Sequence, residues 1–130
     1  MTEPGVVLVV DDDELLQELV KITLEGEGYT VLQALDGASM WRALKARKPD
    51  LIVLDVLLPD TDGRKLVTAL KHERSTARIP ILMWTARYRE VERDAALDLG
   101  IEDFFQKGPA AELEGKIAAI LKRFSERMRL

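Results

Sequence analysis

The sequence predicts an α/β domain in which a single five-stranded parallel sheet is covered by helices on both faces. Two observations indicate this doubly wound fold. Five short apolar segments alternate along the chain with longer segments that have the apolar spacing of helices. Several of the short segments carry no polar residue, which is typical of strands buried on both faces. Because parallel strands are joined by crossovers that pack back on the sheet, we expect helices on each side of it.

The first strand is predicted over residues 6–10, a largely β-branched run that ends at three aspartates. A helix follows, with Asp13 as a suitable N-cap and Gly26 at its end. The apolar residues of this helix have helical spacing: Leu15, Leu16, Leu19, Val20 and Leu24. The next strand, over residues 29–34, is less purely apolar, so we expect it at an edge of the sheet.

The middle of the chain repeats this alternation. A turn at Asp36 and Gly37 leads to a helix that ends before Pro49. A buried strand over residues 51–55 then ends in the carboxylate of Asp55 and leaves through a turn rich in Pro, Asp and Gly. Within that turn we interpret three residues as turn formers only: Asp60, Asp62 and Gly63. A short helix is predicted over residues 65–73.

The last part of the chain supplies two further strands, over residues 81–84 and 103–106. The helix between them is predicted over residues 90–99, with an inward face made of Val91, Ala95, Ala96 and Leu99. Pro109 suits the first turn of a final helix. The apolar face of that helix is predicted to contain Leu113, Ile117, Ile120, Leu121 and Phe124.

The composition excludes several classes of protein. The 130 residues fit one domain that buries a core without disulfides or structural metal. The 19 basic and 23 acidic residues are mixed along the chain and give a net charge of −4, so we expect no direct binding of nucleic acid. With no cysteine, no secretory leader and no apolar run of membrane-spanning length, we expect a soluble, cytoplasmic protein that does not contact the membrane.

Polar residues follow four of the predicted strands. Asp11 and Asp12 follow the first, Asp55 the third, Thr85 the fourth and Lys107 the fifth. Because parallel strands end on the same edge of a sheet, these side chains should converge in one crevice. Aspartate and lysine at such a place are individually common as helix caps and surface residues. Their joint placement favours a functional site.

The residue types in this crevice indicate phosphoryl chemistry. Crowded carboxylates repel one another unless a cation shares their site, and oxygen ligands with open positions suit Mg²⁺ better than zinc. A lysine and a hydroxyl opposite them would bind phosphoryl oxygens. An aspartate can itself be the nucleophile and form an aspartyl-phosphate.

Four segments together resemble the receiver domain of bacterial two-component response regulators. They are VLVVDDD, LIVLDVLLPDTDG, ILMWTA and EDFFQK, and the resemblance covers the chain from Val6 to about Arg123. It implies a flavodoxin-like fold with strand order 2-1-3-4-5. It also implies a domain over residues 1–124, followed at 125–130 by an extension of the last helix that would be a connector stub.

The resemblance assigns roles within the crevice. Asp55 would accept a phosphoryl group from a phosphohistidine on a histidine kinase or a histidine phosphotransfer protein. Asp12 and Asp55 would bind Mg²⁺ directly, the backbone carbonyl of Leu57 would be a third ligand, and Asp11 would act through metal-bound water.

Three further residues would bind the phosphoryl group or respond to its presence. Lys107 would pair with one phosphoryl oxygen, and the hydroxyl of Thr85 would donate to another. Phe104 matches the aromatic residue that turns inward when the threonine moves, although packing in the core is an equally good interpretation from sequence.

Such a domain would be a signalling module rather than an enzyme with a separate substrate, catalysing only its own phosphorylation and slow dephosphorylation. The nearest alternative is a receiver-like interaction module that works without phosphate. A haloacid dehalogenase-type phosphatase would have a second aspartate where Leu57 stands, and a flavodoxin would have a phosphate loop where the three aspartates stand.

Two features depart from the common receiver pattern or extend beyond it. Gly108 stands between Lys107 and Pro109, where the family usually has proline directly after the lysine, so the sequence leaves the geometry of the Lys107–Gly108 peptide open. Apolar residues continue along the last helix to Met128, which suggests a connector or a homodimer contact through the last helices, with a frayed helix end as the third alternative.

Overall fold

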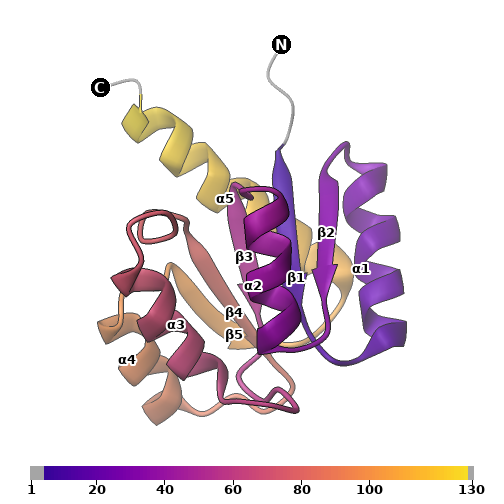
Figure 1. The fold of residues 1–130 in the computed structure, drawn as a ribbon. Coiled ribbons are helices and arrows are strands. Elements are labelled where there is room, and N and C mark those ends of the chain that lie inside the picture. The colour runs from indigo at the N-terminus through magenta and orange to yellow at the C-terminus, as the bar shows by residue number, and fades with distance from the viewer. Residues whose placement is uncertain (1–4, 129–130) are drawn as a thin grey trace.

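The computed structural model describes residues 5–128, and they form one parallel five-stranded sheet (Figure 1). The strand order is β2-β1-β3-β4-β5, as the resemblance implied, and every strand pair is parallel. The predicted edge position of β2 is therefore confirmed. The strands are β1 (Val6–Val10), β2 (Thr30–Ala34), β3 (Leu51–Leu54), β4 (Ile81–Thr85) and β5 (Asp103–Gln106).

Five helices cover the sheet in two layers. They are α1 (Glu14–Gly26), α2 (Gly37–Ala46), α3 (Gly63–His72), α4 (Glu90–Asp98) and α5 (Ala110–Met128). One core contains buried residues of α1 and α5, and the other contains buried residues of α2, α3 and α4. Figure 1 shows the corresponding arrangement, with α2, α3 and α4 on one side of the sheet and α1 on the other. The predicted doubly wound fold is confirmed.

Alternating side chains of each strand fill these two cores. In β1, Val7 and Val9 enter the core under α1 and α5, while Leu8 and Val10 enter the opposite one. All four side chains are at most 1% exposed. This explains why β1 contains no polar residue, because either face of the strand would bury it.

Aspartate side chains begin three of the helices. Asp13 accepts a hydrogen bond from the N–H of Leu16 at 3.0 Å, so the predicted N-cap of α1 is confirmed. Asp36 caps α2 in a capping box, and Asp62 caps α3 through the N–H of Arg64 at 2.8 Å. The cap at Asp62 is the reason that α3 begins at Gly63, two residues before the predicted start.

The inward face predicted for α4 is largely wrong. Of Val91, Ala95, Ala96 and Leu99, only Ala96 is buried, and the side chain of Val91 is 77% exposed. The helix lies over β5, which is the edge strand of the sheet. An edge strand offers less surface to a covering helix than a central strand does, so α4 buries a narrow stripe.

The final helix uses most of its apolar stripe within the domain. Leu113, Ile117 and Ile120 are buried, and Leu121 and Phe124 pack against the same core. The side chain of Met128 and residues 129–130 of the predicted extension lie outside the described residues. No helix in the described part of the chain is long and apolar enough to cross a membrane.

Candidate functional site

Three aspartates meet at the carboxyl ends of β1 and β3. Asp11 and Asp12 directly follow β1, and Asp55 directly follows β3. One carboxylate oxygen from each lies within 4.8 Å of the others. Asp11 and Asp55 are buried, whereas Asp12 is exposed. The predicted convergence of these residues is therefore present in the fold, because the adjacent parallel strands end side by side.

Lys107 joins this acidic cluster from the end of β5. Its Nζ lies 2.5 Å from Oδ2 of Asp11 and 2.9 Å from Oδ2 of Asp55. Its backbone N–H donates to the carbonyl oxygen of Thr85 at 2.7 Å, which anchors the residue to the end of β4. The ammonium group therefore bridges two buried carboxylates.

The buried charges shift the ionisation of the site. Burial raises the pKa of the Asp55 carboxyl, and the negative charge of Asp11 adds to the increase, while the hydrogen bond and charge of Lys107 oppose it. Burial acts to lower the pKa of Lys107, but the hydrogen bonds and charges of Asp11 and Asp55 outweigh burial, so the pKa of Lys107 is raised. The lysine is therefore held in its charged form between the two acids.

The donor set of the cluster fits a hard divalent cation. It offers carboxylate oxygens only, and the exposed Asp12 leaves one side open to solvent. Leu57 lies in the loop after β3 and is 59% exposed, and its backbone N–H acts to lower the pKa of the Asp55 carboxyl. The proposed role of the Leu57 carbonyl as a metal ligand stays a prediction.

Thr85 ends β4 with a hydroxyl that already has local partners. The side chain is 3% exposed, and its Oγ1 accepts from the N–H of Arg87 at 3.2 Å and donates to the carbonyl of Arg87 at 3.3 Å. The hydroxyl is thus bonded to the loop after β4, while the Thr85 carbonyl binds Lys107.

Phe104 occupies an inward position in β5. It is 2% exposed and belongs to the core under α2, α3 and α4. Its ring centroid lies 5.9 Å from that of Tyr88, whose hydroxyl accepts a hydrogen bond from Arg93 at 2.9 Å. The predicted packing of Phe104 in the core is confirmed, and its switching role stays a prediction.

All three residues that we interpreted only as turn formers do more than that, and one of them, Asp62, is the N-cap of α3. A Cβ at Gly63 would overlap the carbonyl oxygen of Asp55, so this position accepts no side chain. Asp60 accepts hydrogen bonds from the N–H groups of Gly37 and Ala38 at 2.9 and 3.1 Å, which tie the loop after β3 to the start of α2. The sequence signal was a run of turn residues, which does not identify such long-range partners.

The peptide geometry after Lys107 is ordinary. No cis peptide bond occurs within residues 5–128, and this range includes the bond from Lys107 to Gly108. The sequence left the geometry of this bond open, and the structure has it trans, as is usual for a bond that does not precede proline.

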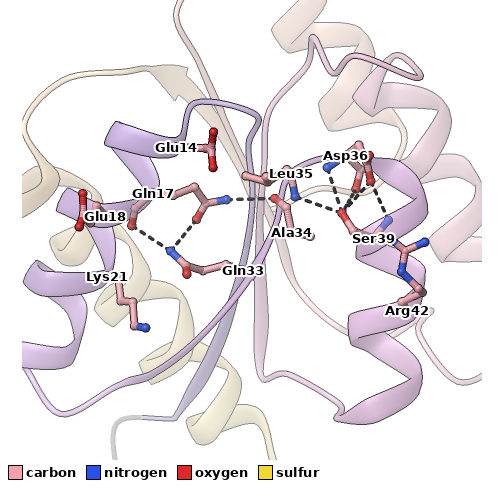
Figure 2. A pocket seen from close by; sticks show the side chains of 10 residues that line it. All are labelled: Glu14, Gln17, Glu18, Lys21, Gln33, Ala34, Leu35, Asp36, Ser39 and Arg42. Carbon is pink, nitrogen blue, oxygen red and sulfur yellow. Dashed lines mark hydrogen bonds between the residues drawn. The ribbon is translucent and has the colours of Figure 1, made fainter.

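A groove of about 580 Å³ lies between α1 and α2 at the end of β2 (Figure 2). Its lining is mostly polar and of both charges, and includes Glu14, Glu18, Lys21, Asp36 and Arg42. The three clustered aspartates do not line it. We therefore place the candidate site at the acidic cluster and not in this groove.

Comparison with known proteins identifies a family for this arrangement. A family model described as the response regulator receiver domain matches residues 7–118. The alkaline phosphatase synthesis transcriptional regulatory protein PhoP of Bacillus subtilis is 39% identical over 118 residues, covering 90% of this chain and 48% of that protein. The chain spans about half the length of the curated relatives it matches.

Solved structures with the same architecture include two response regulators. The BeF3-activated N-terminal receiver domain of RstA from Klebsiella pneumoniae has a TM-score of 0.81 and 25% identity, covering 89% of this chain and 97% of that one. The Mn²⁺-bound form of response regulator Rcp1 has a TM-score of 0.76 and 25% identity, covering 90% and 91% of the two chains.

Proposed function

This chain belongs to the response regulator receiver domain family, and from its site we propose that Asp55 accepts a phosphoryl group in a Mg²⁺-dependent reaction. The observation that carries the proposal is the cluster of three carboxylates within 4.8 Å, with Lys107 bridging two of them. A buried aspartate in this setting combines a nucleophile, a cation site and a fixed positive charge.

The proposed step transfers a phosphoryl group from a phosphohistidine of a histidine kinase or histidine phosphotransfer protein. A carboxylate oxygen of Asp55 attacks phosphorus, a P–O bond forms, and the P–N bond to the imidazole breaks. The imidazole leaves with the electron pair and takes up a proton from solvent. Hydrolysis by water later returns the Asp55 carboxylate and inorganic phosphate. The chain thus catalyses reactions of its own Asp55 only and acts on no other acceptor.

The cation site would be formed by Asp12 and Asp55, with Asp11 contributing through water and Leu57 through its carbonyl. Mg²⁺ would supply positive charge that offsets the repulsion among the carboxylates and the incoming phosphoryl oxygens. The Mn²⁺-bound form of the relative Rcp1 supports a divalent cation for this fold.

Lys107 would change partners when Asp55 is phosphorylated. In the unmodified protein its Nζ binds the carboxylates of Asp11 and Asp55. A phosphoryl group on Asp55 would present new oxygens next to this ammonium, and a charge-assisted bond to one of them would stabilise the product.

The response would pass through the loop that follows β4. Donation by the Thr85 hydroxyl to a phosphoryl oxygen would replace its present bond to the Arg87 carbonyl. That loop also contains Tyr88, whose ring contacts Phe104. We propose that this rearrangement shifts the population between two conformations of the surface formed by α4 and β5.

The partner that donates the phosphoryl group must approach Asp55 over the neighbouring surface. Leu15, Leu19 and Ile22 on α1 are 53–68% exposed, and α1 begins just after the acidic pair. We propose that this apolar strip contacts the kinase or phosphotransfer protein.

We assign no membrane or nucleic-acid partner to this chain, and we propose a cytoplasmic location.

Mass measurement after incubation with Mg²⁺ and acetyl phosphate tests the central proposal. We expect wild type to gain one phosphoryl mass and Asp55→Asn to gain none. Asp12→Asn is a matched isosteric control, and we expect it to be phosphorylated only at raised Mg²⁺ concentration. Absence of a gain in wild type, or an equal gain in Asp55→Asn, overturns the proposal and favours an interaction module that works without phosphate.

We further propose that the part of α5 after about residue 124 is a connector. Alternatively, α5 contacts the α5 helix of a second copy when Asp55 is phosphorylated. Ser125, Glu126 and Arg127 are exposed at this end of the helix, beyond the apolar contacts of Phe124. Gel filtration with and without beryllofluoride tests the second possibility, since an unchanged monomer under both conditions contradicts it.

A further inference from the structure

Gln17 is a buried polar residue of α1 that the proposed reaction does not use. Only 3% of it is exposed, and the other buried residues of α1 are Val20 and Leu24. The polar amide therefore occupies a position that an apolar residue would ordinarily fill, and buried polar groups are retained where they have partners.

The partners of Gln17 are backbone carbonyls at the strand ends that frame the acidic cluster. Its Nε2 lies 3.0 Å from the carbonyl oxygens of Val9, Asp11 and Ala34. These three carbonyls belong to the end of β1, the residue after β1 and the end of β2. Figure 2 shows the bond from Gln17 to Ala34. One side chain thus joins the ends of two neighbouring strands to α1.

The backbone N–H, the backbone carbonyl and both carboxylate oxygens of Asp11 all have polar partners. Its N–H donates to the carbonyl of Ala34 at 3.0 Å, and its carbonyl accepts from Gln17. Its Oδ1 accepts from the N–H of Asp13 at 3.0 Å, which leaves Oδ2 for Lys107. The bond from Gln17 is the contact that fixes the peptide between Asp11 and Asp12.

The Gln17 residue also accepts hydrogen bonds from a second amide, that of Gln33. Nε2 of Gln33 lies 3.1 Å from the carbonyl oxygen of Gln17 and 3.3 Å from its Oε1 (Figure 2). Because Oε1 accepts from Gln33, the nitrogen of the Gln17 amide faces the three carbonyls. The Gln33 side chain donates only to Gln17, so replacing Gln33 leaves the N–H donors of Gln17 available to the strand-end carbonyls.

We propose that Gln17 is a positioning residue for the cation site. Its amide holds the backbone of the turn after β1 so that the carboxylates of Asp11 and Asp12 face Asp55. The proposal rests on the proposed function, because it concerns the same divalent-cation site. Replacing a residue that orients metal ligands without itself binding the metal typically weakens metal affinity by about 10-fold to 100-fold.

The test compares Mg²⁺ affinity, measured by isothermal titration calorimetry, in wild type, Gln17→Met and Gln33→Met. Methionine has a similar length to glutamine but donates no hydrogen bond. We expect Gln17→Met to bind Mg²⁺ about 10-fold more weakly, and Gln33→Met to bind it with nearly wild-type affinity. We also expect phosphorylation of Gln17→Met by acetyl phosphate to recover when Mg²⁺ is raised to saturation.

A purely structural role for Gln17 predicts a different result. In that case Gln17→Met would unfold at lower urea concentration but bind Mg²⁺ as wild type does, and this outcome overturns the proposal. If Gln17→Met does not fold, Gln17→Asn replaces it, since its shorter amide cannot reach all three carbonyls. Wild-type affinity in that folded variant overturns the proposal equally.

The wild-type arm separates this inference from the proposed function. If wild type binds Mg²⁺ but gains no phosphoryl mass, the phosphorylation proposal fails and the affinity ratio between Gln17→Met and wild type still decides the role of Gln17. If wild type gains phosphoryl mass and the ratio is near one, only the inference about Gln17 fails.

Discussion

Lys107 and Asp55 form a buried ion pair, with Nζ and Oδ2 2.9 Å apart, although 52 positions separate them in the chain. The same ammonium binds Asp11. Before any phosphoryl group arrives, the lysine therefore compensates part of the negative charge that crowded carboxylates would otherwise concentrate. The three carboxylates still outnumber this one ammonium, so the cluster retains negative charge that a divalent cation would offset.

Replacement of Lys107 by methionine should destabilise the metal-free protein. It would leave the buried carboxylates of Asp11 and Asp55 without their cation, and breaking a buried pair in this way costs about 3 kcal/mol. Urea unfolding in EDTA measures the change. Lys116→Met is the control, because the side chains of the Lys116–Asp103 pair are 37% and 39% exposed and the pair should contribute less than about 1 kcal/mol. Equal losses in the two variants would contradict the prediction.

Asp55→Asn should change the pH dependence of stability. Folding raises the pKa of Asp55 above its ordinary 3.8, so the folded state holds this proton more tightly than the unfolded chain does. Protonation of Asp55 therefore stabilises the fold fully below pH 3.8, and this contribution is lost as pH rises through the raised pKa. Asparagine does not titrate.

The free energy of unfolding of Asp55→Asn, minus that of wild type, should consequently increase in EDTA as the pH rises from 3.8 through the raised pKa of Asp55. Urea unfolding at several pH values measures it. A difference that stays constant across this range would show that the Asp55 pKa is the same in the folded and unfolded states.

Gly63→Ala should disrupt both the fold and the site. The added methyl group would overlap the carbonyl oxygen of Asp55, and overpacking of this kind typically costs about 2 kcal/mol. We expect weaker phosphorylation as well, because the backbone of Asp55 must move. Gly115→Ala in α5 is the matched control: its methyl group meets nothing within 4 Å and should leave stability unchanged or slightly raised. Similar behaviour of the two variants would argue against the contact.

The contact between Tyr88 and Phe104 should be measurable by comparing two variants of Tyr88. Tyr88→Phe keeps the ring but loses the hydroxyl that Arg93 binds, whereas Tyr88→Ala loses both. We expect the alanine variant to be less stable than the phenylalanine variant by about 1 kcal/mol, the usual contribution of an aromatic pair. Equal unfolding midpoints would mean that the ring contact contributes nothing.

Much of the fold was predictable because local patterns were strong. The unbroken apolar run at residues 6–10 could only be a strand buried on both faces, and Asp13 could cap only a helix that began directly after it. The weak pattern of α4 was misleading, since Val91 has helical spacing but no surface to pack against. Periodicity indicates which residues share a face and not what covers that face.

The sequence was enough to predict which residues gather at the site, but not how they are arranged there. Placement at strand ends was enough to gather Asp11, Asp12, Asp55 and Lys107, because parallel strands finish at one edge. Gln17, Gly63 and Asp60 were not identified as parts of its support. Each acts through a backbone group that is distant in sequence, and no local motif encodes such a partner.

The order of strands and helices along the chain, and the acidic and basic residues at the strand ends, can be read from the amino-acid sequence alone. The folded chain adds that Lys107 bridges Asp11 and Asp55, that burial raises the pKa of Asp55, and that the amide of Gln17 binds the turn after β1. This division arises because hydrogen bonds within helices and the alternation of side chains along strands follow local chain geometry. Burial, charge separation and the partners of a buried amide depend instead on which distant segments the sheet brings together.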